Sequence, residues 1–333
     1  MSFRQTYLQA LPHLTVEQAE ETALALFRYQ AAHCPPYAAY LTQLGCNPQA
    51  VHQLTDIPFL PIEFFKTHDV RTDPQDWEGQ ELFLSSGTTL QQRSRHQLRD
   101  PQLYRDNAVR IFEQFYGPLT SWTFLALLPS YLEQGNSSLV AMIDDFARRS
   151  GQTHEAFFLR DHAALLATLA EAKQDPSRHI MLFGVSYALL DLAAEYGPVP
   201  ELQDLTVLET GGMKGRRREM IREELHQELQ QAFGLGGIHS EYGMTELLSQ
   251  AYSFGDGRFH APAQLRVFLR DPSDPFAVSN HRPDGALNVI DLANVDSCAF
   301  IETKDLARMH PDGSFEVLGR MDNSDVRGCN QMA

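Results

Sequence analysis

Hydroxyl side chains and a glycine stand together at 85–89, where the sequence reads Ser85-Ser86-Gly87-Thr88-Thr89. The hydroxyls, and the backbone N–H groups of such a turn, are hydrogen-bond donors that suit phosphate oxygens. Gly87 has no Cβ atom, so the backbone there can turn sharply and approach a ligand closely. The composition is equally typical of an ordinary polar turn. The stretch therefore indicates either a phosphate-binding loop or a simple turn.

A second polar stretch, Ser240-Glu241-Tyr242-Gly243-Met244-Thr245-Glu246, offers the groups that would complete a nucleotide site. Tyr242 presents a flat ring on which a base could stack, and Gly243 permits a tight turn. Thr245 carries a hydroxyl, and the Glu246 carboxylate is a hard oxygen ligand of the kind that Mg²⁺ prefers. Taken singly, a tyrosine is more often core and a glutamate more often solvated. Together with the first stretch they indicate a site for a nucleotide and magnesium.

The first stretch follows a predicted strand, as do two other polar segments, Ser130–Ser138 and Glu209–Lys214. The second stretch follows the short run Gly237-Ile238-His239. In open α/β sheets, ligands bind outside the carboxyl ends of the strands. If the strands before these four segments share one sheet, we expect the segments to line one cleft. Two basic clusters could attract an anionic substrate, or could simply be solvated surface. They are Arg93, Arg95 and His96, and Lys214, Arg216, Arg217 and Arg218.

The elements that must position these segments alternate between strands and helices. Continuous apolar runs predict strands buried on both faces, and helical spacing of apolar residues predicts the helices. The predicted strands are 82–84, 122–128, 156–159, 179–183 and 205–208, and the helices are 16–33, 37–44, 101–116, 139–149, 163–173, 187–195 and 216–233. From residue 264 the pattern changes to short strands at 265–269, 286–290, 299–301 and 314–318, separated by turns such as Pro-Asp-Gly.

This alternation predicts an α/β fold with a mostly parallel sheet, followed by a small antiparallel β subdomain. We expect four consecutive parts along the chain. Residues 1–80 would be a helical and extended segment packed on the core, and 81–262 the α/β nucleotide-binding core. Residues 263–320 would be the small β subdomain, and 321–333 a hinge-like tail.

The composition limits the classes of partner that the protein is expected to bind. The 333 residues include 43 acidic and 27 basic side chains, for a formal net charge of −16. Such a surface repels nucleic acid and anionic membranes. No apolar run approaches the roughly 20 residues needed to cross a bilayer, and no signal peptide is visible. The four cysteines show no paired metal spacing and no dense disulfide pattern. We expect a cytoplasmic protein with no nucleic-acid partner and no membrane insertion.

The order of several motifs resembles the adenylate-forming superfamily, which contains acyl-CoA synthetases, adenylation domains and luciferases. The motifs are Ser85–Thr89, Gly211-Gly212, Tyr242-Gly-Met-Thr-Glu246, Thr303-Lys-Asp305 and Gly319-Arg-Met-Asp322. A narrower resemblance is to the acyl-protein synthetases (LuxE-type) of the bacterial luciferase fatty-acid reductase system. It is carried by Leu128-Pro-Ser-Tyr-Leu-Glu133, Gly135-Asn-Ser-Ser138, Gly211-Gly-Met-Lys214 and Arg327-Gly-Cys329. Together the motifs span roughly Phe64 to Cys329.

The resemblance implies ATP and Mg²⁺ as cofactors and assigns a role to each motif residue. Next to Ser85, the ATP phosphates would be held by Ser86, Gly87, Thr88 and Thr89. The adenine would lie along Gly211 and Gly212, with Tyr242 stacked on it and Gly243 turning the chain. Thr245 would reach the α-phosphate, and Glu246 would ligate Mg²⁺. Asp305 would hold the ribose hydroxyls, and Arg320 would lie near the ribose or a phosphate.

The implied activity is ATP-dependent conversion of a carboxylic acid, fatty or aromatic, into an acyl-adenylate, followed by acyl transfer to a thiol or another acceptor. Cys329 would accept the acyl group as a thioester, because a thiolate is the right nucleophile for a mixed anhydride; alternatively it is a thiol with no role. An acyl carrier, a reductase or an acyltransferase could be the partner protein. Apolar side chains that could wall an acid pocket, or simply belong to the core, are Phe64, Phe65, Tyr131, Phe183, Met213 and Met244.

Two features depart from the superfamily pattern. The phosphate loop continues with Leu90-Gln91-Gln92 where many members have another glycine and a lysine, and Arg93 could replace that charge. The mobile C-terminal domain, whose lysine assists adenylation, is expected to be missing. Lys214 could act instead, or could be a surface residue at a helix start. Two other functions therefore stay open: a phenylacetate-type acyl-CoA ligase, and a non-catalytic nucleotide-binding remnant.

Overall fold

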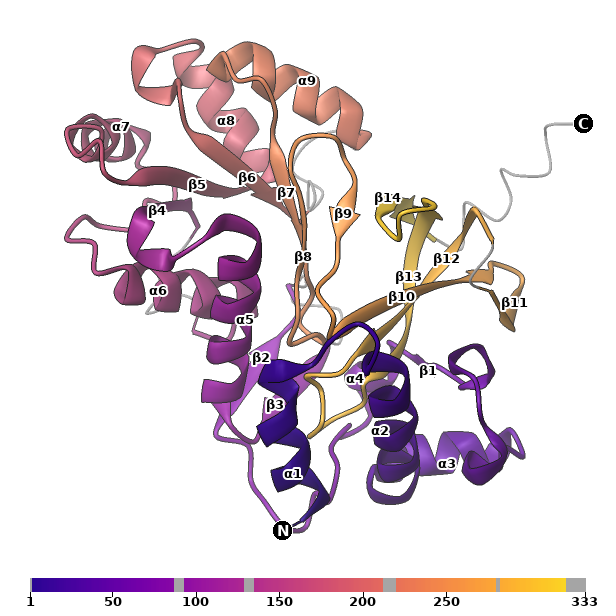
Figure 1. Ribbon diagram of the computed structural model, residues 1–333. Helices are drawn as coiled ribbons and strands as arrows, with labels where there is room; N and C mark the ends of the chain where they lie inside the picture. Colours follow the sequence, from indigo (N-terminus) through magenta and orange to yellow (C-terminus); the bar gives the residue numbers. More distant parts are fainter. Residues whose placement is uncertain (1, 87–92, 129–134, 212–219, 280–281, 322–333) are drawn as a thin grey trace, which may run out of the picture. The chain divides into compact units, whose positions relative to one another are not determined.

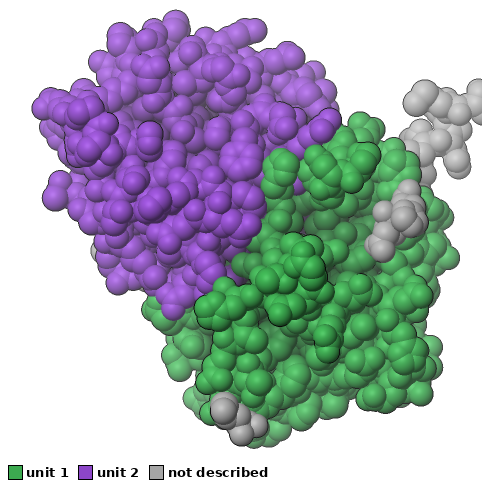
Figure 2. Space-filling view, in the orientation of Figure 1, with its two compact units in different colours: residues 1–104, 245–249, 260–333 green, residues 105–244, 250–259 purple. Residues whose placement is uncertain are grey.

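The computed structural model describes residues 2–86, 93–128, 135–211, 220–279 and 282–321. The chain forms two compact units, each built from segments that are not contiguous in sequence (Figure 2). The first unit comprises residues 1–104, 245–249 and 260–333, and the second comprises residues 105–244 and 250–259. This is a different division from the four consecutive parts expected above, whose boundaries stay a prediction.

The second unit is built on a mainly parallel sheet. Its strands are β4 (Trp122–Leu127), β5 (His179–Val185), β6 (Thr206–Thr210), β7 (His239–Tyr242) and β8 (Ala251–Ser253), in the order β8-β7-β6-β5-β4. Neighbours from β4 to β7 run parallel, and β8 is antiparallel to β7. Every residue of β4 is buried, as expected for a strand covered on both faces.

Helices cover both faces of this sheet (Figure 1). They are α6 (Ser138–Ser150), α7 (His162–Ala172), α8 (Ser186–Tyr196), α9 (Arg222–Phe233) and most of α5 (Pro101–Tyr116), with 3₁₀ turns at Leu119–Ser121 and Pro200–Leu202. Under α5 and α6, the ring of Phe112 lies 5.3 Å from that of Phe124 and 5.0 Å from that of Phe146. This aromatic cluster fixes α5 and α6 on one face of the sheet.

The first unit contains an antiparallel sheet. Its strands are β10 (Leu265–Asp271), β11 (Asp274–Ser279), β12 (Asp284–Asp291), β13 (Phe300–Met309) and β14 (Phe315–Arg320), in the order β11-β10-β12-β13-β14. The short strand β1 (Leu60–Pro61) pairs with β13 in parallel. A separate antiparallel hairpin joins β2 (Glu81–Leu84) to β3 (Arg95–Leu98). Strand β9 (Phe259–His260) stands where the chain re-enters this unit.

The N-terminal helices pack on the antiparallel sheet through aromatic residues. They are α1 (Phe3–Ala10), α2 (Ala19–His33), α3 (Pro35–Gln43) and α4 (Phe64–Thr67), with 3₁₀ turns at Leu11–His13, Pro48–Ala50 and Leu54–Asp56. The rings of Phe27 and Tyr37 lie 5.6 Å and 6.1 Å from that of Phe300 on β13. None of the helices in the described residues combines the length and apolar composition needed to span a bilayer.

The predicted fold class is confirmed, and the predicted helices and strands are mostly found within a few residues of their expected bounds. Helix α2 begins at Ala19 rather than at residue 16. Helix α3 begins at Pro35 rather than at residue 37. Proline is suited to that position because the first N–H groups of a helix have no partner within it.

The burial of one predicted strand, the existence of another and the start of one helix are wrong. The run at 82–84 does not belong to a sheet buried on both faces, because β2 pairs only with β3 and of its residues only Phe83 is buried. Residues 156–159 form a single bridge, from Phe157 to Ala126, instead of a strand. Helix α9 begins at Arg222, since residues 220 and 221 are not helical, and 212–219 lie outside the described residues.

Candidate functional site

The backbone of Thr245 and Glu246 is held by two side chains from distant parts of the first unit. His96, on β3, donates from Nδ1 to the carbonyl oxygen of Thr245 at 2.8 Å. Asn294 donates from Nδ2 to the carbonyl oxygen of Glu246 at 2.8 Å. Residues 243–249 form no helix or strand, so these carbonyl groups depend on such donors when they are buried.

The Glu246 side chain is itself buried, with 4% of its surface exposed. Burial raises the pKa of its carboxyl. A hydrogen bond from Ser94 and the positive charges of Arg320 and Lys66 act in the opposite direction without cancelling that effect. The partners of this buried carboxyl therefore do not fully offset the effect of burial, and an additional cation would stabilise its ionised form.

A second buried carboxylate anchors the residues that follow. Asp291, at the end of β12, accepts hydrogen bonds from the backbone N–H groups of Leu248 and Ser249 at 2.6 and 3.0 Å. It also accepts from the Ser249 hydroxyl at 2.6 Å and from the N–H of Ala293 at 3.1 Å. The segment 245–249 is thus fixed at both ends by side chains of the first unit.

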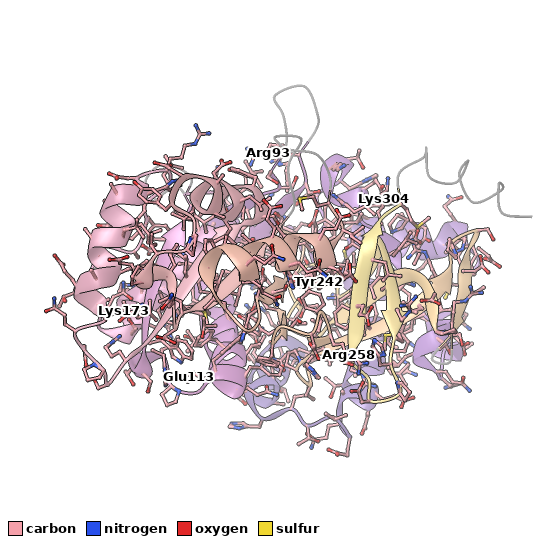
Figure 3. All side chains as sticks on the ribbon, turned by 90° about the horizontal axis from the view of Figure 1, so that it is seen from above. Arg93, Glu113, Lys173, Tyr242, Arg258 and Lys304 are labelled. Carbon is pink, nitrogen blue, oxygen red and sulfur yellow. The ribbon has the colours of Figure 1, made fainter. Side chains whose placement is uncertain are left out.

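Asp305 and Arg320 form an ion pair across two strands. They are directly opposite each other in the register of β13 and β14, and Arg320 Nε lies 3.5 Å from Asp305 Oδ1. The Asp305 side chain is 13% exposed and that of Arg320 is 71% exposed. Neighbouring Lys304, labelled in Figure 3, is paired with Glu63. The strand register therefore brings together two residues that the sequence separates by 15 positions.

Hydrogen bonds join the ends of β2 and β3, the two strands between which the first polar stretch lies. Ser94 donates its N–H to Ser85 Oγ at 2.9 Å, and Ser85 donates its N–H to the Ser94 carbonyl at 3.1 Å. The Arg93 guanidinium, labelled in Figure 3, donates to the carbonyl oxygens of Ser85 and Leu84. Ser86 is exposed. Ser85 and Arg93 thus stabilise the end of this hairpin.

His96 does not supply the positive charge suggested by its basic neighbours. The ring is 2% exposed, and burial lowers the pKa of His96 to about 4. The imidazole is therefore neutral near pH 7, and its Nδ1 proton is committed to the Thr245 carbonyl.

The described residues fit a magnesium ion in the manner that is usual for this metal. They contain no group of three or more histidine, cysteine, aspartate or glutamate side chains that could hold a metal alone. Mg²⁺ is commonly bound by one or two carboxylates together with substrate phosphates and water. Glu246 offers one buried carboxyl, and a bound cation would favour its ionised form against the effect of burial.

In the second unit, a charged network surrounds the end of β6. Glu209 accepts hydrogen bonds from the hydroxyls of Ser186 and Ser240 at 3.1 and 2.9 Å, and Arg222 Nε lies 3.3 Å from it. Burial works to raise the pKa of Glu209, but these partners and His226 outweigh it and lower the pKa. Glu209 is therefore a buried, ionised carboxylate.

The same network reaches the candidate adenine segment. Gly211 has a φ of 75°, which is a left-handed conformation that favours glycine, and its carbonyl lies 2.8 Å from the Ser186 hydroxyl.

Tyr242, which is labelled in Figure 3, ends β7 and is 7% exposed. Its ring lies 5.9 Å from that of Phe259. The preceding Glu241 accepts a hydrogen bond from the Thr210 hydroxyl at 2.5 Å, and burial raises the pKa of Glu241 to about 7. A Cβ atom on Gly243 would lie 2.1 Å from Glu241 Oε1, so this side chain lies over the glycine. Ser240, Glu241 and Tyr242 are strand residues, which corrects the prediction of a loop starting at Ser240.

Six of the predicted site residues lie outside the described residues: Gly87, Thr88, Thr89, Gly212, Lys214 and Cys329. The rest divide between the units. Ser85, Ser86, Thr245, Glu246, Asp305 and Arg320 belong to the first unit, and Gly211, Tyr242 and Gly243 to the second. Among the apolar candidates for an acid pocket, Phe65 and Phe183 are fully buried, which favours the core interpretation, and Tyr131 and Met213 lie outside the described residues.

Sequence reasoning missed Asn294, Asp291 and the positioning contact of His96. No local pattern marks them, since His96 and Thr245 are 149 positions apart and Asn294 and Glu246 are 48 apart. The available signal was the segment between two predicted strands, Asp291 to Ser297, in which four of seven residues are polar. All seven residues are buried.

No known family profile matches this chain, and no curated protein matches it. Several solved structures resemble its fold. ATP-bound MatB from Rhodopseudomonas palustris is 18% identical, with a TM-score of 0.50 over 72% of this chain and 47% of that chain. The O-succinylbenzoate coenzyme A synthetase MenE from Bacillus subtilis, in complex with ATP and magnesium, is 18% identical, with a TM-score of 0.51 over 72% of this chain and 49% of that one.

Apo MatB is 16% identical, with a TM-score of 0.51 over 87% of this chain and 57% of that chain. The chain thus spans about half the length of these solved proteins. At such low identity the likeness shows the fold alone, a mixed α/β fold that this chain shares with these proteins.

Proposed function

We propose that this chain activates a carboxylic acid with ATP, forming an acyl-adenylate and releasing diphosphate. The observation that carries the proposal is the position of Glu246. Its carboxyl is buried, burial raises the pKa of that carboxyl, and the peptide groups on either side of the residue each accept a hydrogen bond from a buried side chain. The fold is shared with a protein solved with ATP bound and with one solved with ATP and magnesium, which supports the same ligands here.

The reaction requires two anions to approach each other. A carboxylate oxygen of the acid forms a bond to the α-phosphorus of ATP, and the bond from that phosphorus to diphosphate breaks. A bound Mg²⁺ would offset the repulsion between the anions and neutralise the leaving diphosphate. Oriented donors and cations of the protein lower the barrier further, because they are aimed at the developing charge before the reaction starts.

Each candidate residue has a proposed role in binding. Glu246 would hold Mg²⁺, and the Thr245 hydroxyl would donate to the α-phosphate. Asp305 would accept from the ribose hydroxyls, with Arg320 beside the ribose or a phosphate. The stretch Ser85–Thr89 would bind the other phosphates, and Gly211, Gly212 and Tyr242 would bind the adenine.

The finer proposal is an acyl-protein synthetase. The Cys329 thiolate, or a thiol of a partner protein, would attack the acyl carbon, and AMP would leave. An acyl carrier, a reductase or an acyltransferase is the kind of partner that would use the product. A CoA ligase is the second candidate, since the similar MenE is described as a coenzyme A synthetase.

Exchange of labelled diphosphate into ATP tests the activation step. A panel of fatty and aromatic acids is assayed with and without CoA. We expect acid-dependent exchange by the wild-type protein, and its loss in E246Q, which removes a metal ligand without changing the size of the side chain. The matched control is E316Q, because Glu316 also lies in the first unit but is paired with His310. Exchange by E246Q at the wild-type rate would reject the role of Glu246.

Covalent labelling tests the acceptor. With a radiolabelled acid and ATP, C329S should form the adenylate but lose the protein-bound label. Persistent labelling of C329S would place the acceptor elsewhere, and release of acyl-CoA only when CoA is present would favour the CoA ligase.

A further inference from the structure

Two buried side chains converge on adjacent peptide groups of the segment that carries Thr245 and Glu246. His96 comes from β3, and Asn294 comes from the loop between β12 and β13. Each gives one hydrogen bond of 2.8 Å, to the carbonyl of Thr245 and to that of Glu246 respectively. Since these residues share one compact unit, their geometry belongs to a single packed body.

Both donors are held rigidly. The His96 ring packs edge-on against the ring of Phe65, with centroids 5.7 Å apart. The carbonyl of Asn294 accepts a 2.6 Å hydrogen bond from the buried Gln30 amide, and its N–H donates to the Asp291 carbonyl at 3.0 Å. The ring of His96 and the backbone of Asn294 are therefore held by contacts within the first unit.

The Asn294 amide has a defined orientation. Its nitrogen must face the Glu246 carbonyl, because the flipped amide would set two oxygens against each other. Its Oδ1 atom is buried without a partner among the described residues, as is the hydroxyl of Ser297. Both residues, with His96, line a cavity of about 10 Å³, which has room for about one water. A water there could bond to Oδ1 while Nδ2 stays on the carbonyl of Glu246.

We propose that His96 and Asn294 are positioning residues that set the direction in which the side chains of Thr245 and Glu246 face their ligands. The inference rests on the proposed function of that pair. A carboxylate must point within a narrow range to ligate Mg²⁺, whose octahedral geometry tolerates little distortion. The hydrogen bonds to the two carbonyls fix the peptide groups on either side of Glu246 and so restrict the direction of its side chain. His96 and Asn294 need not contact the ligand to do so.

The test is the magnesium dependence of ATP binding to the full chain, measured by calorimetry. N294L has a similar side-chain size but no donor, and H96L likewise removes one. Both should raise the half-saturating Mg²⁺ concentration about tenfold. H96N should restore most of the wild-type value, because its amide nitrogen stands where Nδ1 stood. The matched control is T72V, since Thr72 is a buried donor to the carbonyl of Val295 in the same loop.

T72V should lower the melting temperature but leave the Mg²⁺ dependence within about twofold of wild type. Wild-type Mg²⁺ dependence in N294L and H96L, or an equal shift in T72V, would overturn the inference. N294S, whose shorter hydroxyl falls short of the carbonyl, replaces N294L under the same criteria if the latter does not fold. Magnesium-dependent ATP binding without diphosphate exchange would reject only the proposed function, and absence of such binding in wild type would reject both.

Discussion

Replacing Asp291 by asparagine tests how the segment 245–249 is anchored. The carboxylate accepts four hydrogen bonds at 2.6 to 3.1 Å, two on each oxygen. An amide keeps only one oxygen, so two donors lose their acceptor and face an NH₂ group. A buried donor left unsatisfied costs about 1–3 kcal/mol. Burial raises the pKa of Asp291, which means that its charged form is costly to bury. Removing the charge therefore offsets part of the loss in the free energy of unfolding. We expect D291N to lower the free energy of unfolding by about 3 kcal/mol.

The two tryptophans allow the stability of the first unit to be measured separately. Trp77 belongs to the first unit and Trp122 to the second. In a W122F background, urea unfolding followed by Trp77 fluorescence reports the first unit. D312N is the control, because Asp312 is an exposed residue of the same unit and accepts the same kinds of bond, from the N–H and hydroxyl of Ser314, on a single oxygen that asparagine keeps. Its effect should be far smaller. A loss below about 1 kcal/mol in D291N would refute the assumption that these donors have no other acceptor.

Two further predictions concern the second unit. A Cβ atom on Gly184 would lie 2.6 Å from Cγ of the buried Leu189, so G184A should lower the free energy of unfolding by about 1–3 kcal/mol through overpacking, whereas G236A, with nothing within 4 Å, should not. Trp122 fluorescence in a W77F background measures both, and equal effects would contradict the packing. Because burial raises the pKa of Glu241 to about 7, its protonated form favours folding, and this contribution to stability is lost as pH rises through 7. E241Q should therefore show a smaller fall in stability between pH 5 and 8 than its parent; an equal fall would show that other groups cause it.

The elements that could be predicted best are the buried strands whose sequences are continuous apolar runs. The strands at 122–128 and 179–183 were identified in this way because both faces of each are covered by helices, so nearly every side chain is apolar. The short apolar run at 82–84 looked the same but belongs to a two-stranded hairpin with one buried residue. Three apolar residues are too few to separate the two cases by pattern alone.

The candidate site could be predicted only in part. The types of Thr245 and Glu246 indicated their chemistry, whereas the roles of Asp305 and Arg320 were implied only by the resemblance. The strand register sets Asp305 opposite Arg320. Their supports could not be predicted, because a polar residue that is buried and hydrogen-bonded looks the same in sequence as a solvated one. His96 illustrates this: beside Arg93 and Arg95 it suggests a positive cluster, yet burial keeps it neutral.

The most direct test of the central claim follows an oxygen atom. An acid labelled with ¹⁸O in both carboxylate oxygens is incubated with ATP, Mg²⁺ and the wild-type protein, and the nucleotide products are analysed by mass spectrometry. If the acid attacks the α-phosphorus, cleavage of the adenylate at its acyl carbon leaves one ¹⁸O atom in AMP, and this is the result that we predict. Unlabelled AMP, or ADP with ¹⁸O in orthophosphate, would contradict adenylation.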